Sequence, residues 1–156
     1  METELLRKFL TSANKAGYAS GNTRTWVKEN DGSSSITYVD GSLTFHDNFF
    51  GGEPFGGRVI VAEAAQPKWI MVYYGKIVTD TPANPVFQFL RAALKQMPEE
   101  IPLRGPSHFQ LEALKYTNQW SGDLSRFSGT EQISSSGTPV YEGFYNGGWV
   151  DTRSGV

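Results

Sequence analysis

Two stretches of the chain carry apolar residues at the three- and four-residue spacing of an amphipathic helix. In the first, over residues 3–16, the apolar positions are Leu5, Leu6, Phe9, Leu10 and Ala13. Gly17 follows as a typical helix stop. A second helix is predicted over residues 85–97, with Asn84 as its N-cap, Pro85 at its first position and Pro98 after its end.

Alternating apolar and polar positions predict antiparallel strands in most of the remaining chain. We expect hairpins over residues 36–50, 58–78 and 124–150. Between the first two hairpins, Gly51-Gly52 and Gly56-Gly57 bracket a short segment. Glycine allows positive φ, so this segment is predicted to be a sharp bend.

These patterns predict an α+β fold, with a bent antiparallel sheet of about seven strands covered by two helices in a single domain over residues 1–150. The run 109–121 begins with helix-forming residues, but its alternation favours a further strand. Residues 20–35 are polar and turn-rich, which is typical of either a lid over a site or a disordered loop. The polar residues 151–156 predict a flexible tail.

Part of the first half of the chain recurs 72 residues later. Residues 55–78 align without gaps to residues 127–150, and six of the 24 aligned positions are identical. The identical pairs are Phe55/Phe127, Gly57/Gly129, Pro67/Pro139, Tyr73/Tyr145, Gly75/Gly147 and Val78/Val150. Two helix-plus-meander halves, 1–80 and 81–150, would pack about a pseudo-twofold axis and form an aromatic cleft at their junction. Chance use of the same turn residues in two hairpins is the alternative.

Composition narrows the class of protein. The chain has 156 residues, of which 13% are aromatic, and no cysteine, so disulfides, zinc–thiolate sites and thiol nucleophiles are excluded. A net charge of -2 gives no electrostatic footprint for nucleic acid, and we expect no direct nucleic-acid binding. No apolar run reaches the length of a membrane span, so a cytoplasmic protein without a membrane partner is expected.

The sequence shows no recognisable catalytic, metal or nucleotide motif. His46 and Asp47 are neighbours on a predicted strand, where adjacent side chains point to opposite faces, so they do not form a catalytic pair. His46 and His108 have no carboxylates at the spacing of a metal site. We therefore expect neither a metal nor a cofactor, and we assign no catalytic residue.

The candidate ligand-binding residues are polar groups in apolar surroundings and aromatic residues of the repeated segment. Asp47 shares a strand face with Phe45 and Phe49, where a carboxylate needs a donor or its pKa rises. Arg104 lies in a loop stiffened by proline on both sides, which suits the capture of an anion. The full candidate set is Asp47, Trp69, Tyr73, Arg104, Glu131, Tyr141 and Tyr145.

Each candidate also has a purely structural interpretation. Asp47 can pair with an arginine, and Arg104 can form a purely structural ion pair with Asp47 or Glu131. Glu53 and Glu131 lie near the glycine bends and can be solvated turn charges. The aromatic candidates can be core residues.

A series of short motifs stands in a characteristic order along the chain. The motifs are Tyr18-Ala19, the Asp47 strand leading to Phe55-Gly56-Gly57, Pro67-Lys68-Trp69-Ile70-Met71, Tyr74-Gly75, Leu103-Arg104-Gly105-Pro106, Phe127 to Ile133, Val140-Tyr141-Glu142 and Gly147-Gly148. This series resembles a bacterial domain family of unknown function that is often found behind an XRE-type helix-turn-helix in transcriptional regulators.

The resemblance covers most of residues 5–150 and implies a sensor or partner domain, with no established catalytic residues to carry over. Two features depart from the family pattern. Phe45, His46 and Phe49 stand where the family usually has tyrosines around the aspartate. The chain also carries no helix-turn-helix of its own.

The function that we expect is the binding of a small molecule or effector in an aromatic cleft, with Arg104 or Asp47 as the polar anchor. One alternative is an uncharacterised enzyme that uses Asp47, Glu131 or His46 for acid–base chemistry, although the sequence favours binding over catalysis. The other is a protein-interaction domain that forms a homodimer through an exposed strand.

Overall fold

One antiparallel sheet dominates the computed structural model, which describes residues 1–19, 26–151 and 153. In the described residues the sheet has nine strands in the order β1-β2-β3-β4-β5-β9-β8-β7-β6. The strands are β1 (Val27–Lys28), β2 (Ser34–Asp40), β3 (Leu43–Gly51), β4 (Phe55–Glu63), β5 (Gln66–Ile77), β6 (His108–Leu111), β7 (Leu114–Asp123), β8 (Arg126–Ser135) and β9 (Thr138–Trp149). The α+β class and the antiparallel sheet with two helices are confirmed.

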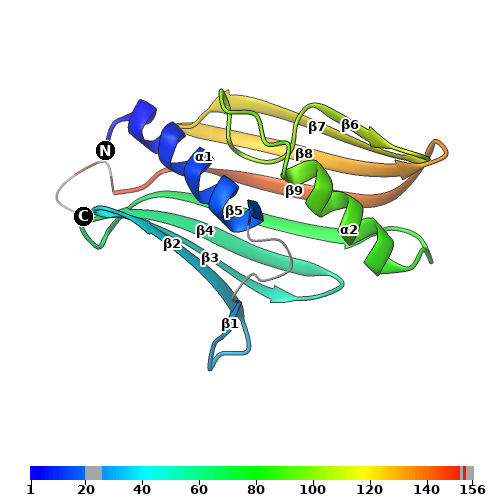
Figure 1. The fold of residues 1–156 in the computed structure, drawn as a ribbon, viewed down its shortest axis with the longest axis horizontal. Coiled ribbons are helices and arrows are strands. Elements are labelled where there is room, and N and C mark those ends of the chain that lie inside the picture. The colour runs from blue at the N-terminus through cyan, green and yellow to red at the C-terminus, as the bar shows by residue number, and fades with distance from the viewer. Residues whose placement is uncertain (20–25, 152, 154–156) are drawn as a thin grey trace.

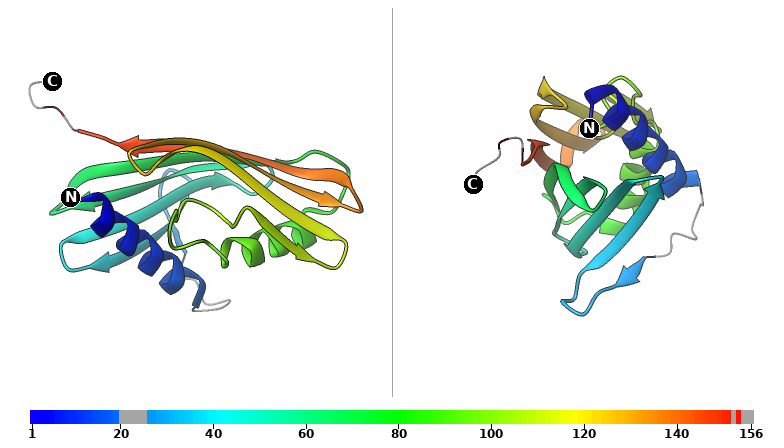
Figure 2. Two further views of the ribbon diagram at one scale, coloured as in Figure 1. Left: turned by 90° about the horizontal axis from the view of Figure 1, so that it is seen from above. Right: turned by 90° about the vertical axis from the view of Figure 1, so that its left-hand side faces the viewer.

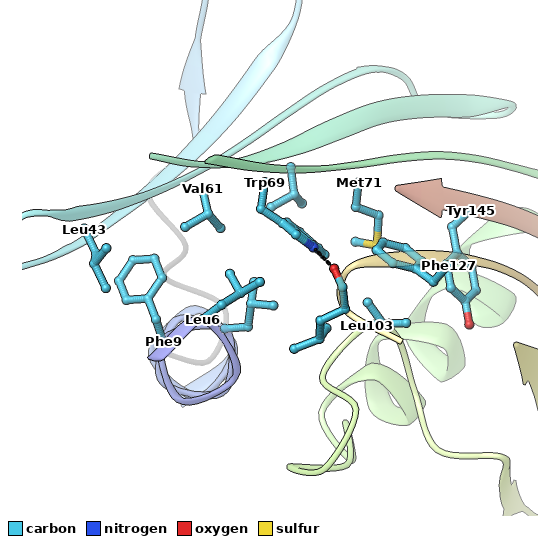
Figure 3. Close-up of a cluster of buried hydrophobic side chains, with 12 residues drawn as sticks. Leu6, Phe9, Leu43, Val61, Trp69, Met71, Leu103, Phe127 and Tyr145 are labelled. Atoms are coloured by element: carbon cyan, nitrogen blue, oxygen red, sulfur yellow. Dashed lines mark hydrogen bonds between the residues drawn. The ribbon is translucent and has the colours of Figure 1, made fainter. Parts of the chain in front are cut away.

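The two helices lie on the same face of the sheet, which curves around them (Figures 1 and 2). Helix α1 spans Thr3–Ala19 and α2 spans Ala83–Leu94. Their apolar residues form two clusters against the inner face of the sheet. Leu6 and Phe9 of α1 point toward the sheet residues Leu43, Val61 and Trp69, and the Phe9 ring lies beside Leu43, as Figure 3 shows.

The prediction of seven strands is wrong, because the structure adds the short edge strand β1 and divides the predicted strand 109–121 into β6 and β7. Strand β1 lies within the polar run that was expected to be irregular. The run 109–121 is a hairpin, β6 and β7, whose turn holds Glu112 at a φ of 53°. The helix-forming residues near 112 therefore belong to a tight turn, because pairing with β8 decides the conformation of β7.

The helix ends also differ from the prediction. Helix α1 continues through Gly17 to Ala19. Helix α2 begins at Ala83, so Asn84 lies inside it and Pro82 is the N-cap, without a side-chain hydrogen bond. Pro85 is tolerated in this first turn because the amide N–H groups there have no intrahelical partner.

Helix α2 ends at Leu94, three residues before the predicted end. The amide of Gln96 donates to the Ala93 carbonyl, and the amide of Met97 donates to the Leu94 carbonyl. These i→i+3 bonds tighten the chain beyond the helix, as is common at helix C-termini.

The strand registers follow an approximate twofold symmetry. On the central pair β5–β9, Tyr73 lies opposite Tyr145, which is also the residue 72 positions later. The β4–β5 ladder shifts register after Val61, and the β8–β9 ladder shifts after Ile133, again 72 positions later. The axis of this symmetry therefore passes through the Tyr73–Tyr145 pair.

Two expected flexible segments fall partly outside the described residues. Within the run 20–35, residues 20–25 are not described, and the rest holds β1, a turn and the start of β2. Within the expected tail 151–156, residues 152 and 154–156 are not described. Among the described residues, neither helix has the length and apolar character needed to cross a membrane.

Candidate functional site

Two neighbouring cavities lie between the helices and the inner face of the sheet. The first, which we call the α1 cavity, has a volume of about 310 Å³. It is lined by α1, by β2 to β5 and by the loop after α2, and its side chains include Leu10, Ala13, Phe45, Val59, Trp69 and Met71. Its walls are therefore mainly apolar.

The second cavity, which we call the α2 cavity, has a volume of about 240 Å³ and is rich in aromatic side chains. The aromatic lining residues are Trp26, Phe49, Phe55, Tyr73 and Phe87. Both cavities are lined by Ile36, Asp47, Tyr73, Leu94 and Arg104. Three of these shared residues are polar, and all three are candidates from the sequence.

Asp47 and Tyr73 form a hydrogen bond on the inner face of the sheet. The Tyr73 hydroxyl on β5 donates to Asp47 Oδ1 on β3 at 2.6 Å. The tyrosine ring must cross the intervening strand β4, and it does so over Gly57, where a Cβ atom would meet the hydroxyl at 2.6 Å. Asp47 has a donor in Tyr73, as a carboxylate on an apolar face requires.

Arg104 is held on one edge by Glu131 of β8. Its Nη2 donates to Glu131 Oε1 at 2.5 Å, and its Nε donates to Oε2 at 3.1 Å. The guanidinium carbon also lies 5.5 Å from the centre of the Tyr73 ring, within cation–π range. The remaining nitrogen, Nη1, has no hydrogen-bond partner among the described residues.

Glu131 is a buried residue, so its interpretation as a solvated turn charge is wrong. The Tyr116 hydroxyl donates to Oε2 at 2.7 Å, and the Tyr141 hydroxyl donates to Oε1 at 2.9 Å. Together with Arg104, these groups supply four hydrogen bonds to the carboxylate. A buried carboxylate is stable only with such compensation.

The pKa values follow from this pairing. Burial pushes the pKa of Glu131 upward, but the Arg104 charge and the four hydrogen bonds outweigh it and hold the pKa below its ordinary value. The pKa of Arg104 is raised well above its usual range, because the Glu131 charge and hydrogen bond outweigh burial. Burial, then the Glu131 charge, raises the pKa of Tyr116 and of Tyr141. The cluster is therefore an ion pair with two neutral tyrosines.

The other aromatic candidates occupy different positions. Trp69 is fully buried, lines the α1 cavity and donates its indole N–H to the Leu124 carbonyl at 2.8 Å, the bond drawn in Figure 3. Tyr141 and Tyr145 are buried and line neither cavity. The structure thus brings Asp47, Tyr73 and Arg104 together, with Glu131 and Tyr141 behind Arg104.

Sequence reasoning missed Tyr116 and Asn118. The Tyr145 hydroxyl donates to Asn118 Oδ1 at 2.7 Å, the counterpart of the bond from Tyr73 to Asp47. Asn118 also donates through Nδ2 to the Gly105 carbonyl at 2.8 Å. The repeat offers a signal for both residues. The second bend is one residue longer than the first, and a one-residue gap there aligns Phe45 with Tyr116 and Asp47 with Asn118.

The remaining titratable candidates lie elsewhere. His46 neighbours Asp47 on β3 and pairs with Thr37 and Ile60. His108 is exposed at the start of β6. Glu53 accepts a hydrogen bond from the Ile77 amide at 2.8 Å near the surface. In the part of the chain that the structure describes, no group of three or more His, Asp or Glu side chains is placed to hold a metal ion.

Comparisons with known proteins place the chain in a family. The family model described as "Domain of unknown function (DUF5680)" matches residues 47–150, which begin at Asp47 and include Tyr73, Arg104 and Glu131. Searches of curated proteins and of solved structures found no match. Because the family model covers about two thirds of the 156 residues, the chain belongs to the DUF5680 family of domains of unknown function.

Proposed function

We propose that this domain binds a small molecule in the α1 cavity. The observation that carries the proposal is the meeting of Asp47, Tyr73 and Arg104 on the boundary between two cavities with largely apolar walls. Ligand sites combine an apolar lining with a few fixed polar groups that set the orientation of the ligand. The volume of about 310 Å³ is at the lower end of the range for such sites, which favours a small ligand.

Arg104 supplies a donor that is already oriented. Glu131 holds one edge of the guanidinium and the guanidinium carbon lies over the Tyr73 ring, so its position is set before a ligand arrives. A preorganised donor costs a ligand little ordering entropy. Nη1, which carries two N–H groups, remains as a donor for a ligand.

We further propose that ligand occupancy is a signal, and that the domain serves as the sensor of a cytoplasmic bacterial transcriptional regulator. The support is the resemblance to domains found behind an XRE-type helix-turn-helix. Leu10 and Ala13 of α1 line the cavity, so a ligand would contact α1 directly. A ligand shifts a conformational equilibrium only through such differential contacts, and here they would bear on the packing of α1.

The proposal is tested by a thermal-shift screen of the purified chain against a metabolite library. A ligand that binds only the folded state raises the melting temperature. Each hit is then measured with Ala13→Leu, which places a larger side chain in the α1 cavity. We expect the shift to be lost in this variant.

Ala92→Leu is the matched control. Ala92 is a half-buried residue of α2 that lines neither cavity, so the same change should leave the shift intact. A library without hits would contradict the proposal, and so would hits whose shifts survive Ala13→Leu.

A second candidate function is self-association. Val72, Tyr74 and Phe144 are large apolar residues exposed on the two central strands, and Tyr74 lies opposite Phe144. Clustered exposed apolar residues are typical of interaction surfaces. Light scattering of the wild type and of Tyr74→Lys tests this candidate, since a dimer that uses these residues should dissociate in the variant.

A further inference from the structure

The α1 cavity has a counterpart in the second half of the sheet. Six of the residues that line it lie on β3, β4 and β5, and the same register positions on β7, β8 and β9 hold six other residues. The lining residues are Phe45, Asp47, Val59, Trp69, Met71 and Tyr73. Their counterparts, in the same order, are Tyr116, Asn118, Glu131, Tyr141, Gly143 and Tyr145.

The chain itself occupies the counterpart region. The loop after α2 brings the Arg104 guanidinium onto Glu131 and the Gly105 carbonyl onto Asn118. Gly105 lies so close to the Tyr116 ring that a Cβ atom would meet it at 2.8 Å. In the second half, therefore, a segment of the same polypeptide sits where the first half has a cavity.

The two regions differ in chemistry at the positions around the group that fills each region, which we call the guest. In the second half the guest is the Arg104 side chain. In the second half, the Glu131 carboxylate accepts from the Arg104 guanidinium, and the Tyr116 and Tyr141 hydroxyls donate to that carboxylate. The first half has Val59, Phe45 and Trp69 at these positions. A charged guest buried against these three residues would lose its hydration without compensation, which is costly.

The charges at the cavity boundary lead to the same conclusion. An anion bound at Arg104 would add a second negative charge to a guanidinium that Glu131 already neutralises, and it would also lie near Asp47. A cation would be attracted by Asp47, but this attraction would be offset by repulsion from Arg104, because both residues line the cavity. An uncharged hydrogen-bond acceptor avoids both costs and can use Nη1 as its donor.

Building on the proposed function, we infer that the α1 cavity takes an uncharged, mostly apolar molecule with a hydrogen-bond acceptor. Its ring or branched chain lies against Val59, Trp69 and Met71, and its acceptor faces Arg104. Arg104 and Gly105 fill the polar region of the second half, and the small molecule fills the apolar region of the first.

Three probes of one shape and different charge test this inference. They are 2-acetylnaphthalene, which is neutral and has a carbonyl acceptor, 2-naphthoate, which is an anion, and 2-(aminomethyl)naphthalene, which is a cation at neutral pH. Binding to the full chain is measured by NMR titration. We expect the neutral ketone to bind at least about tenfold more tightly than either charged probe.

Val59→Thr keeps the shape of the side chain while replacing one methyl group with a hydroxyl, and it should weaken binding of the ketone. Val39→Thr makes the same change at an exposed position outside the cavity and should leave binding unchanged. Tighter binding of the naphthoate or of the amine, with the effect of Ala13→Leu retained, overturns the inference and leaves the proposed function standing. If Ala13→Leu weakens the binding of no probe and of no library compound, both the inference and the proposed function fail.

Discussion

Tyr73 and Tyr145 lie directly opposite each other on β5 and β9, and each donates a hydrogen bond to a residue two strands away. Tyr73 reaches Asp47 on β3, and Tyr145 reaches Asn118 on β7. The two sheet halves thus share one arrangement. In each, a tyrosine from a central strand crosses the neighbouring strand and forms a hydrogen bond with a side chain on the strand beyond it. The first half uses this arrangement beside a cavity, and the second half uses it beside the buried Arg104–Glu131 pair.

The tyrosine crossing depends on glycine in the strand that lies beneath each ring. A Cβ atom at Gly57 would meet the Tyr73 hydroxyl, and one at Gly129 would meet the Tyr145 ring. We expect Gly57→Ala and Gly129→Ala each to lower the free energy of unfolding by about 1–3 kcal/mol, the usual cost of overpacking. Urea denaturation followed by circular dichroism measures this loss.

Gly52→Ala is the control for these glycine changes. A Cβ atom at Gly52 would meet nothing within 4 Å, and its φ does not require glycine. Its effect should stay within about 0.5 kcal/mol, as for an ordinary surface substitution. Equal effects at all three glycines would show that ring contact is not the cause.

The Arg104–Glu131 pair should be strongly coupled. With 11% and 2% of their side chains exposed, each charge depends on the other for compensation. Glu131→Gln and Arg104→Met should each lower the free energy of unfolding by about 3–5 kcal/mol, because each leaves a buried charge unpaired. The double variant should lose less than the sum, since no unpaired charge remains.

The double-mutant cycle is measured by urea denaturation, with Glu100→Gln as an exposed control that should have little effect. Additive losses in the double variant would mean that the two side chains act independently. Such a result would contradict a buried ion pair.

Acid should remove the stabilisation that Glu131 provides. Its pKa is lowered in the folded state, so its contribution is fully present above the unfolded value of about 4.5 and is lost as pH falls through the folded pKa. The free energy of unfolding should therefore fall more steeply below about pH 4.5 in the wild type than in Glu131→Gln. Parallel acid profiles would show that Glu131 has no lowered pKa.

Asn118 should not tolerate replacement by aspartate, although an aspartate, Asp47, stands at the counterpart position in the first half. Its Nδ2 donates to the Gly105 carbonyl, and an aspartate would replace this donor with a buried negative charge facing a carbonyl oxygen. We expect Asn118→Asp to cost at least about 2 kcal/mol at neutral pH and less in acid, where the new carboxyl is protonated.

Gln119→Glu is the matched control for Asn118→Asp, because it makes the same amide-to-carboxylate change at the next, exposed position of β7. Chemical denaturation at pH 7 and pH 4 compares the two variants. If Asn118→Asp is as stable as Gln119→Glu, the bond to Gly105 contributes nothing measurable.

Several features of the fold were readable from local pattern. The spacing of Leu6, Phe9 and Leu10 predicted α1, and alternation predicted most strands, because both depend on which side of an element meets the core. Strand β1 was not predicted, and β6 was not separated from β7 within the predicted strand 109–121. Two and four residues are too few to carry a period, and their conformation comes from pairing with β2 and β7.

The candidate site was predictable only in part. Local sequence patterns indicated Asp47, Tyr73 and Arg104 as candidates. These residues are a charge on an apolar strand face, an aromatic residue in a repeat and an arginine in a stiff loop, and each stands out locally. These three residues lie together at one boundary because the loop after α2 folds back toward the sheet, and the hydrophobic periodicity of the sequence does not predict the course of that loop.

By itself, the sequence determined the two amphipathic helices, the strand pattern and the 72-residue spacing of Tyr73 and Tyr145, since each follows from residue type and order. Only the tertiary structure decided that Glu131 is buried, that it holds Arg104, and that Val59 faces a cavity at the counterpart position. The reason is physical: a glutamate can lie in water or in the core, and its burial is stable only where a distant arginine and two tyrosines converge on it.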